Sequence, residues 1–121
     1  MKSNDDHAKR YDLEERTFQV AQAGRAFVKK LPRTVANIED AKQFIRSSGS
    51  IGANYIEANE AIGKKDFAMK VKTCRREAKE SGYWLRLLEI QSTSESDRDI
   101  LIAEATKLMK IFGTIVRKGE R

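Results

Sequence analysis

The segment Arg46–Ala58 reads RSSGSIGANYIEA, and the tripeptide KDF follows it at residues 65–67. Five of the six residues from 47 to 52 are Ser or Gly, which lower helix propensity, although the apolar residues on both sides keep the spacing of a helix. Such residues inside a helix need a reason in packing. Small side chains one turn apart lower two ridges of the helix surface, so we expect a neighbouring helix to approach closely there. The residues concerned are Ser48, Gly49, Gly52 and Ala53.

Two helices are predicted in the first half of the chain. The first has apolar or small residues in alternating steps of four and three, and it ends before Pro32, because proline cannot continue the hydrogen-bond ladder. The second is expected to start near Asn37, with Asp40 three residues on, although Thr34 is an earlier candidate for the N-cap. Glycine is typical of the place where a helix stops, so Gly63 is expected to mark the end of the second helix. We call the residues of each helix that are expected to face the other helices its seam. The seam of the first helix is Leu13, Thr17, Val20, Gly24, Phe27 and Leu31, and that of the second is Ala41, Phe44, Ser48, Ile51, Tyr55 and Ala58.

A third helix is predicted from Lys64 to Gln91, roughly 40 Å long at 1.5 Å per residue. A polar segment at residues 92–97 separates it from a fourth helix. The two seams are Phe67, Val71, Cys74, Ala78, Ser81, Leu85, Leu88 and Leu101, Ala105, Leu108, Phe112, Ile115. Four helices with short connections predict an all-α fold, an antiparallel up-down-up-down four-helix bundle. We expect one domain over residues 11–121, preceded by a flexible polar tail over residues 1–10.

The bulk composition limits the class of protein. The 121 residues carry a net charge of +6, which is compatible with an anionic partner. The single cysteine, Cys74, allows no internal disulfide and favours a reducing compartment. No apolar run approaches the roughly 20 residues of a membrane helix, and the polar, acidic N-terminus lacks the apolar core of a signal peptide. We therefore expect a soluble cytoplasmic protein without a membrane partner.

Patterns of catalytic and metal-binding residues are weak in this chain. The only histidine is His7, so the paired Glu-x-x-His motifs of a di-iron bundle cannot form. The carboxylate pairs Glu57–Glu60 and Glu77–Glu80 are better interpreted as ion-pair partners, and Cys74 lies on a predicted seam, where a thiol behaves as a small hydrophobe. Gly49–Gly52 lacks the pattern of a phosphate-binding loop and follows no predicted strand. We predict no catalytic residue, no metal and no cofactor.

The pattern R-S-x-x-S-I-x-A-N-x-x-E over Arg46–Glu57, with K-D-F after it, resembles the signature of the small four-helix-bundle proteins encoded in intervening sequences of bacterial 23S ribosomal RNA genes. The resemblance extends over roughly residues 11–117. It implies a helical bundle that assembles as a ring-like homo-oligomer, commonly a pentamer. Accessory proteins of diversity-generating retroelements are similar to this family and bind nucleic acid and a reverse transcriptase. That similarity implies RNA or a nucleic-acid-bound protein as a partner.

The same resemblance singles out polar positions. Asn54 and Glu57 belong to its motif, as does a Glu thirteen residues after the Phe of K-D-F, which is Glu80 in this chain. The chain departs from the pattern at residues 56–59, which read IEAN where many members have Ala-Glu-Gly. We expect Arg46 to join these three residues in a partly buried structural cluster, because buried charges must be paired and hydrogen-bonded.

Basic residues at intervals of seven predict a positive stripe along the third helix. Residues 61–91 carry eight Lys or Arg against four acids, whereas residues 32–60 carry three against four. The stripe consists of Lys65, Lys72, Lys79 and Arg86, with Arg75 and Arg76 alongside. Such a run is often only a solvated face, but a long stripe with little acid on the same line could follow a phosphate backbone. No aromatic residue alternates with it, so sequence-specific readout is not indicated.

The end of the third helix is apolar on almost every side, and one seam cannot bury all of it. We interpret Tyr83, Trp84, Leu87 and Ile90 as a subunit interface. The first functional hypothesis is a non-enzymatic, oligomeric basic module that binds RNA or a ribonucleoprotein. The alternative is a homo-oligomeric protein–protein interaction scaffold without nucleic-acid binding, whose charge only keeps it soluble. A steep salt dependence of RNA binding would favour the first.

Overall fold

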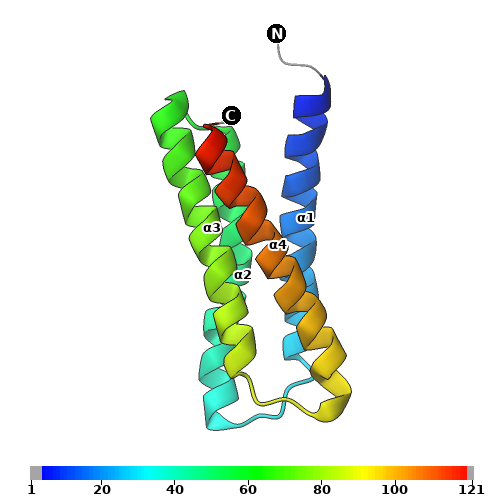
Figure 1. The fold of residues 1–121 in the computed structure, drawn as a ribbon. Coiled ribbons are helices and arrows are strands. Elements are labelled where there is room, and N and C mark those ends of the chain that lie inside the picture. Colours follow the sequence, from blue (N-terminus) through cyan, green and yellow to red (C-terminus); the bar gives the residue numbers. More distant parts are fainter. Residues whose placement is uncertain (1–3, 120–121) are drawn as a thin grey trace.

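The computed structural model describes the backbone of residues 4–119 and the side chains of residues 12–119. Four long α-helices fill this range, and the short 3₁₀ helix η1 (Ser92–Ser94) precedes the last of them. They are α1 (Asn4–Val28), α2 (Val35–Asn59), α3 (Gly63–Leu87) and α4 (Glu95–Lys118). The helices run alternately in opposite directions (Figure 1), which confirms the predicted antiparallel four-helix bundle. The tail expected over residues 1–10 overlaps α1 from Asn4 onward, and residues 1–3 lie outside the described part of the chain.

Each helix packs against the next one in sequence, and α4 returns to α1. The α1–α4 contact is the smallest of the four, and two ion pairs span it. Arg16 Nε donates to Glu104 Oε2 at 2.6 Å, and Arg16 Nη2 donates to the other carboxylate oxygen at 2.9 Å. Nearer the turn that follows α1, Lys30 Nζ lies 2.8 Å from Asp97 Oδ2. The bidentate pair fixes the orientation of the two helices as well as joining them.

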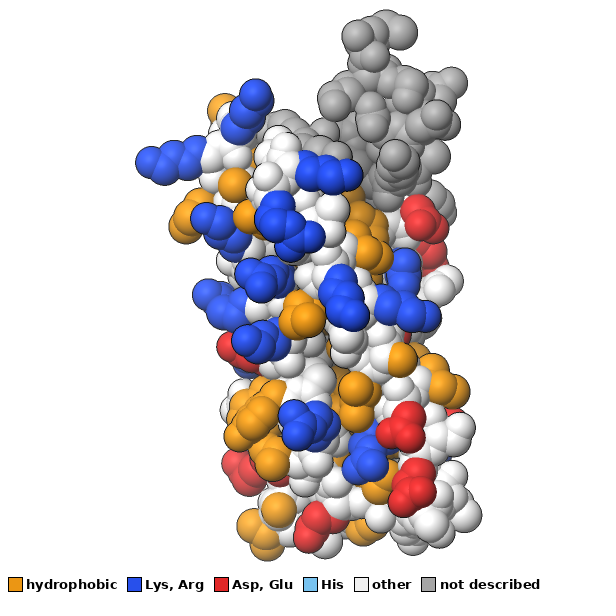
Figure 2. All heavy atoms as spheres, viewed as in Figure 1, with side chains coloured by type: hydrophobic (Ala, Val, Ile, Leu, Met, Phe, Trp, Pro, Cys, Tyr) orange, Lys and Arg blue, Asp and Glu red, His pale blue; other side chains and the backbone are white. Residues whose placement is uncertain are grey.

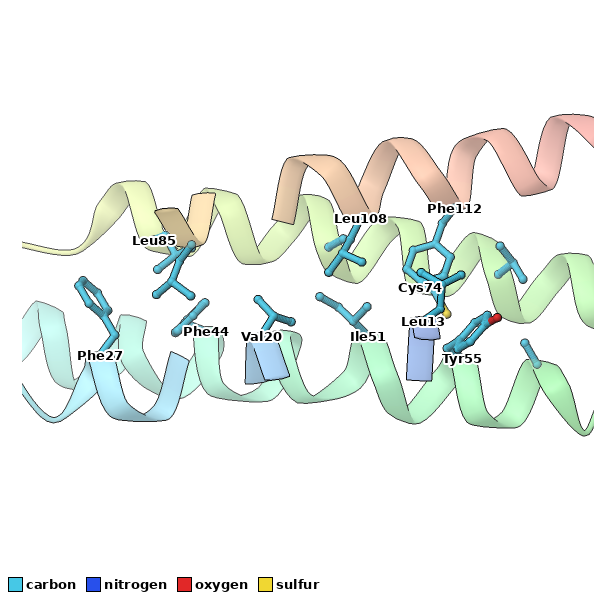
Figure 3. Packing of buried hydrophobic residues seen from close by; sticks show 14 of the residues in the cluster. Leu13, Val20, Phe27, Phe44, Ile51, Tyr55, Cys74, Leu85, Leu108 and Phe112 are labelled. Atoms are coloured by element: carbon cyan, nitrogen blue, oxygen red, sulfur yellow. The ribbon is translucent and has the colours of Figure 1, made fainter. Parts of the chain in front are cut away.

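The predicted seams form the hydrophobic core. Every seam residue of α2 and of the third helical segment is buried. The seams of the first and fourth segments are buried too, except that Leu31 and Ile115 are half-buried. Leu108 and Phe112 point into the space between the helices (Figure 3), and the rings of Tyr55 and Phe112 pack with their centroids 5.6 Å apart. The alternating spacing of four and three residues therefore located the core correctly.

The small residues of α2 allow close packing on two sides. Toward α1, a Cβ added at Gly52 would stand 2.8 Å from Thr17 Oγ1, closer than real Cβ atoms come to other atoms. Toward α3, Ser47 Oγ lies 2.9 Å from Ser81 Oγ. The pair Gly52 and Thr17 thus lies between α1 and α2, and the pair Ser47 and Ser81 lies between α2 and α3. The expected close approach is confirmed at Gly52, whereas the next residue, Ala53, faces solvent because it lies further round the helix.

The start of α2 is fixed by a side-chain cap. Thr34 is the N-cap, and its hydroxyl oxygen accepts a hydrogen bond from Asn37 N at 3.1 Å. The expected start near Asn37 is therefore wrong by about one turn, and the earlier candidate is right. Asn37 is buried instead, and its Nδ2 donates to the carbonyl oxygens of Pro32 and Glu89 at 2.9 and 2.8 Å. This amide ties the α1–α2 turn to the end of α3.

Helix α3 ends at Leu87, four residues before the predicted end at Gln91. Leu88 keeps the seam spacing and is buried, but its backbone is extended, with φ −62° and ψ 138°. The N–H of the next residue, Glu89, donates to Asn37 Oδ1 at 2.8 Å instead of continuing the helix. A tertiary hydrogen bond thus stops a helix that the apolar pattern alone would extend.

Gly63 directly follows the turn between α2 and α3. Its φ is +81°, a value that glycine adopts without steric cost and other residues rarely adopt. We predicted that it would close α2, but α2 ends at Asn59 and Gly63 is the first residue of α3.

Candidate nucleic-acid interface

Charged side chains on different sides of α3 face different neighbouring helices. Two acids face α2, where Arg46 Nη1 lies 3.1 Å from Glu77 Oε2 and Arg46 Nη2 lies 3.7 Å from Glu80 Oε1. Glu77 is only 4% exposed, so its charge needs this partner. The prediction that the Glu77–Glu80 pair serves in ion pairs is confirmed, and both carboxylates share one arginine on the α2 side of the helix.

Of the four residues predicted to form a polar cluster, the structure brings together Arg46 and Glu80. Asn54 Nδ2 donates instead to the carbonyl and hydroxyl oxygens of Ser50, one turn earlier in α2, both at 2.9 Å. Glu57 is exposed and forms no ion pair or side-chain hydrogen bond with the other three among the described residues. The prediction of a four-residue cluster is therefore wrong for Asn54 and Glu57.

The antiparallel register of α2 and α3 explains this correction. Ser47 lies opposite Ser81, so Glu57, ten residues further along α2, faces α3 near residue 71. That position is roughly 14 Å from Glu80 along the helices, at 1.5 Å per residue. The register instead brings Glu77 to the arginine of α2. A motif within one helix does not show which residue of the other helix lies opposite it, because the register depends on the packing of both helices.

The six basic residues predicted to bind nucleic acid are all exposed. They are Lys65, Lys72, Arg75, Arg76, Lys79 and Arg86. Arg75 reaches the neighbouring helix α4, because its Nε lies 3.5 Å from the point where a Cβ of Gly113 would stand. Lys72 and Lys79, one turn before and after Arg75, share its side of α3. None of the six forms an ion pair with an acid whose side chain is described, so the protein leaves their charges unneutralised.

Positive side chains continue from α3 onto α4. Figure 2 shows Lys and Arg side chains over the upper part of this face, formed by the first half of α3 and the last half of α4, with acids mainly toward the lower end and the edges. On α4 the exposed basic residues are Lys107, Lys110, Arg117 and Lys118. We use the name basic face for the six α3 residues together with Lys110 and Arg117. The sequence prediction omitted these two, although they are seven residues apart, the same spacing that revealed the stripe.

The four apolar residues predicted to form an interface fall into two pairs. Tyr83 and Leu87 are 54% and 45% exposed, whereas Trp84 and Ile90 are half-buried and pack against the core. The Tyr83 ring meets the Trp84 ring edge-on, with centroids 5.1 Å apart. On the neighbouring start of α2, Ile38 is also exposed, at 39%. The surface available to a partner is therefore smaller than the sequence indicated.

The described residues offer little for covalent or metal chemistry. Cys74 is fully buried, and this burial raises the pKa of its thiol to about 12, so the nucleophilic thiolate is disfavoured near neutral pH. No group of three or more His, Cys, Asp or Glu side chains in the described range could hold a metal ion. In the same range, none of the helices has the length and apolar character needed to cross a bilayer.

Comparisons with known proteins agree with the helical fold. The model of the family described as 23S rRNA-intervening sequence protein matches residues 9–114. A crystal structure of a protein with unknown function from the S23 ribosomal protein family of Bacteroides thetaiotaomicron VPI-5482 is similar, with a TM-score of 0.74 and 27% sequence identity. The match covers 90% of this chain and 98% of that one. No curated protein matches the chain.

Proposed function

The chain belongs to the family of 23S rRNA-intervening sequence proteins, and from this membership and its charge distribution we propose that it is a non-enzymatic module that binds RNA or a ribonucleoprotein. The observation that carries the proposal is the basic face, whose eight exposed Lys and Arg side chains lack an acidic partner among the described residues. A surface of this kind displaces the counterions of phosphates, which is the main sequence-independent contribution to nucleic-acid binding.

The shape of the basic face supports contact with a phosphate backbone. From Lys65 to Arg86 it extends roughly 30 Å along α3, at 1.5 Å per residue. Glu77 and Glu80 are directed to the α2 side of this helix, where Arg46 pairs with them, so the only acid of α3 without an ion pair to a described side chain is Asp66 in its first turn. Contacts from Lys and Arg to phosphates position a protein on nucleic acid without reading its bases. We therefore propose binding with little sequence preference.

We propose in addition that the module acts as a homo-oligomer, with the exposed pair Tyr83 and Leu87 at the contact between subunits. Apolar side chains that remain exposed together mark surfaces for association. The family resemblance favours a pentamer. An oligomer would present several basic faces at once, and simultaneous engagement of one RNA raises the apparent affinity well above that of a single face.

The test of RNA binding is the triple variant Lys72→Gln, Lys79→Gln and Arg86→Gln. Each replacement removes a charge and keeps a long polar side chain at an exposed position, so folding should be unaffected. A plot of log affinity against log salt has a slope of about −0.7 per phosphate contact for single strands, so the slope should become shallower by about 2. The measurement is a salt titration of binding to a short single-stranded RNA of mixed sequence.

A matched control removes three charges elsewhere, at the exposed residues Lys29, Arg33 and Lys42, each changed to Gln. It has the same net charge as the triple variant but an intact basic face, so it should bind nearly as the unmodified protein does. Equal losses in the two triple variants would mean that overall charge, not the basic face, governs binding. If the unmodified protein does not bind RNA at low salt, the proposal fails.

The second candidate function is a protein–protein interaction scaffold. The exposed apolar side chains of Tyr83, Leu87 and Ile38 favour it, since they could bind another protein as well as another copy of the chain. Such binding would be insensitive to salt and would survive the triple substitution on the basic face, which separates it from RNA binding.

A further inference from the structure

Gly113 of α4 is buried, although Lys110 and Arg117 on the same helix and Arg75 on α3 are exposed. Two arginines cover it. A Cβ at this position would stand 3.4 Å from Arg117 Nη1 and 3.5 Å from Arg75 Nε, and the Arg75 Cδ would be 3.7 Å away. The two guanidinium nitrogens, one from each helix, therefore lie within about 7 Å of each other, the sum of the first two distances.

The two arginines converge without an acid between them. Arg117 Nη2 donates to the neutral hydroxyl of Thr114 at 3.0 Å, and neither arginine forms an ion pair with any described carboxylate. Two other arginines that cross between helices do meet carboxylates, namely Arg16 at Glu104 and Arg46 at Glu77. Like charges held this close repel each other unless an anion lies between them.

We propose that Arg75 and Arg117 form a binding site for one phosphate group of RNA over Gly113. A phosphate oxygen accepts hydrogen bonds from a guanidinium at about 2.8 Å, so nitrogens separated by up to about 7 Å can bond to different oxygens of the same phosphate. The missing side chain at Gly113 leaves room for an oxygen between them. Lys72 and Lys110, one turn from Arg75 and Gly113 on their own helices, add positive potential at the same place.

This inference rests on the proposed function for the source of the phosphate, and it adds a defined two-helix site to the basic face. Both arginines are exposed, so the site is open enough for a phosphate within a polynucleotide chain. Inorganic phosphate presents the same acceptor oxygens, and it is therefore a separate arm of the test.

The test is Gly113→Glu, which places a carboxylate where the phosphate would bind. The new side chain would pair with Arg75 and Arg117 within the protein, and glutamate is a better helix former than glycine, so the bundle should remain folded. RNA affinity should fall about tenfold or more, because charge-assisted hydrogen bonds to a phosphate are lost. The salt slope should become shallower by about 1.4, the equivalent of two contacts at 0.7 each.

Two controls isolate the effect. Gly82→Ala replaces a glycine of α3 at a position where an added Cβ has no atom within 4 Å, so it changes helix propensity outside the site and should bind RNA nearly as the unmodified protein does. Gln91→Glu makes the same change of net charge at an exposed residue in the connection before α4, whereas Gly113 lies about 27 Å along α4 from its first residue, Glu95, at 1.5 Å per residue. This control should also leave binding intact. Thermal melting of all three variants confirms that each is folded.

The outcomes separate the site from the general proposal. If the unmodified protein binds RNA and Gly113→Glu binds with the same affinity and slope, the two-arginine site is refuted while the basic face stands. If the unmodified protein does not bind RNA, titration with inorganic phosphate shows whether the two-arginine site binds a phosphate group from another source. A phosphate-dependent rise in melting temperature that Gly113→Glu abolishes would keep the site and overturn RNA as its ligand. No such rise would overturn the site as well.

Discussion

Gly52 determines how closely α1 can lie against α2. Its missing side chain makes room for Thr17, whose hydroxyl donates into its own helix, with Leu13 O at 2.8 Å and Glu14 O at 3.0 Å. Thr17 is fully buried, so it cannot turn toward solvent to make space. The low helix propensity of glycine at this position is therefore offset by a close contact between two helices.

We predict that Gly52→Leu destabilises the bundle by about 1 to 3 kcal/mol, because a larger side chain must push α1 away or strain its own rotamer. Chemical denaturation measures this as a lower unfolding midpoint. The matched control is Ala53→Leu, which adds a similar volume on the exposed side of the same helix and should change stability by no more than about 0.5 kcal/mol. Equal midpoints for the two variants would contradict the account of close packing.

Individual apolar positions could be predicted from the sequence, whereas of the predicted polar contacts only that of Arg46 with Glu80 is found. The seam of α3 is buried from Phe67 to Leu88 as its spacing required, because burial of a stripe depends on the period of one helix. The partner of Arg46 depends on how far α2 slides along α3, which neither sequence pattern contains. The same reason explains why the meeting of Arg75 and Arg117 over Gly113 was not foreseen.

The ends of the helices depend on tertiary contacts more than their middles do. The interior of α3 agrees with the apolar pattern, but its end is four residues early because Asn37 binds both the N–H and the C=O of Glu89. Asn37 in turn is buried because Thr34 starts α2 one turn before it. One amide side chain thus joins the start of one helix to the end of the next.

We predict that Asn37→Ala lowers stability by about 1 to 3 kcal/mol, because it leaves the part-buried N–H of Glu89 and the carbonyl oxygens of Pro32 and Glu89 without their partner. Asn54→Ala is the comparison, since the amide of Asn54 bonds only to Ser50 within its own helix and is half-buried. Its loss should be clearly smaller in the same denaturation experiment. Amide hydrogen exchange should also show faster exchange at Glu89 in the first variant, and unchanged protection there would argue against the bridging role.

For the molecule as a whole, positive charge is concentrated toward one end of the α3–α4 face. Apart from Arg86, the basic face lies toward the start of α3 and the end of α4 (Figure 2), while the exposed pair Tyr83 and Leu87 lies near the end of α3. Assembly through this pair would leave most of each basic face open to solvent. The bundle architecture was predictable from four apolar periods and short connections, but this separation required the antiparallel arrangement of α3 and α4.

We predict that the protein is a homo-oligomer, with a mass by light scattering several times the 13.8 kDa of one chain. Tyr83→Ser combined with Leu87→Glu should reduce that mass, because both side chains are exposed and neither supports the core. Trp84→Ala should also weaken assembly, but it would disturb core packing at the same time. Ile62→Glu is the control, since this 91% exposed apolar residue lies in the turn between α2 and α3. A monodisperse monomer at micromolar concentration would refute the prediction.

The burial of Cys74 gives the chain an internal reporter of its own opening. It is the only thiol, and no part of its side chain reaches the surface. Because burial raises its pKa from 9.0 to about 12, ionisation favours the unfolded chain as the pH rises between those values. At neutral pH an alkylating reagent can react with Cys74 only after the helices separate. The rate of alkylation therefore follows transient unfolding under native conditions, without any denaturant or attached dye.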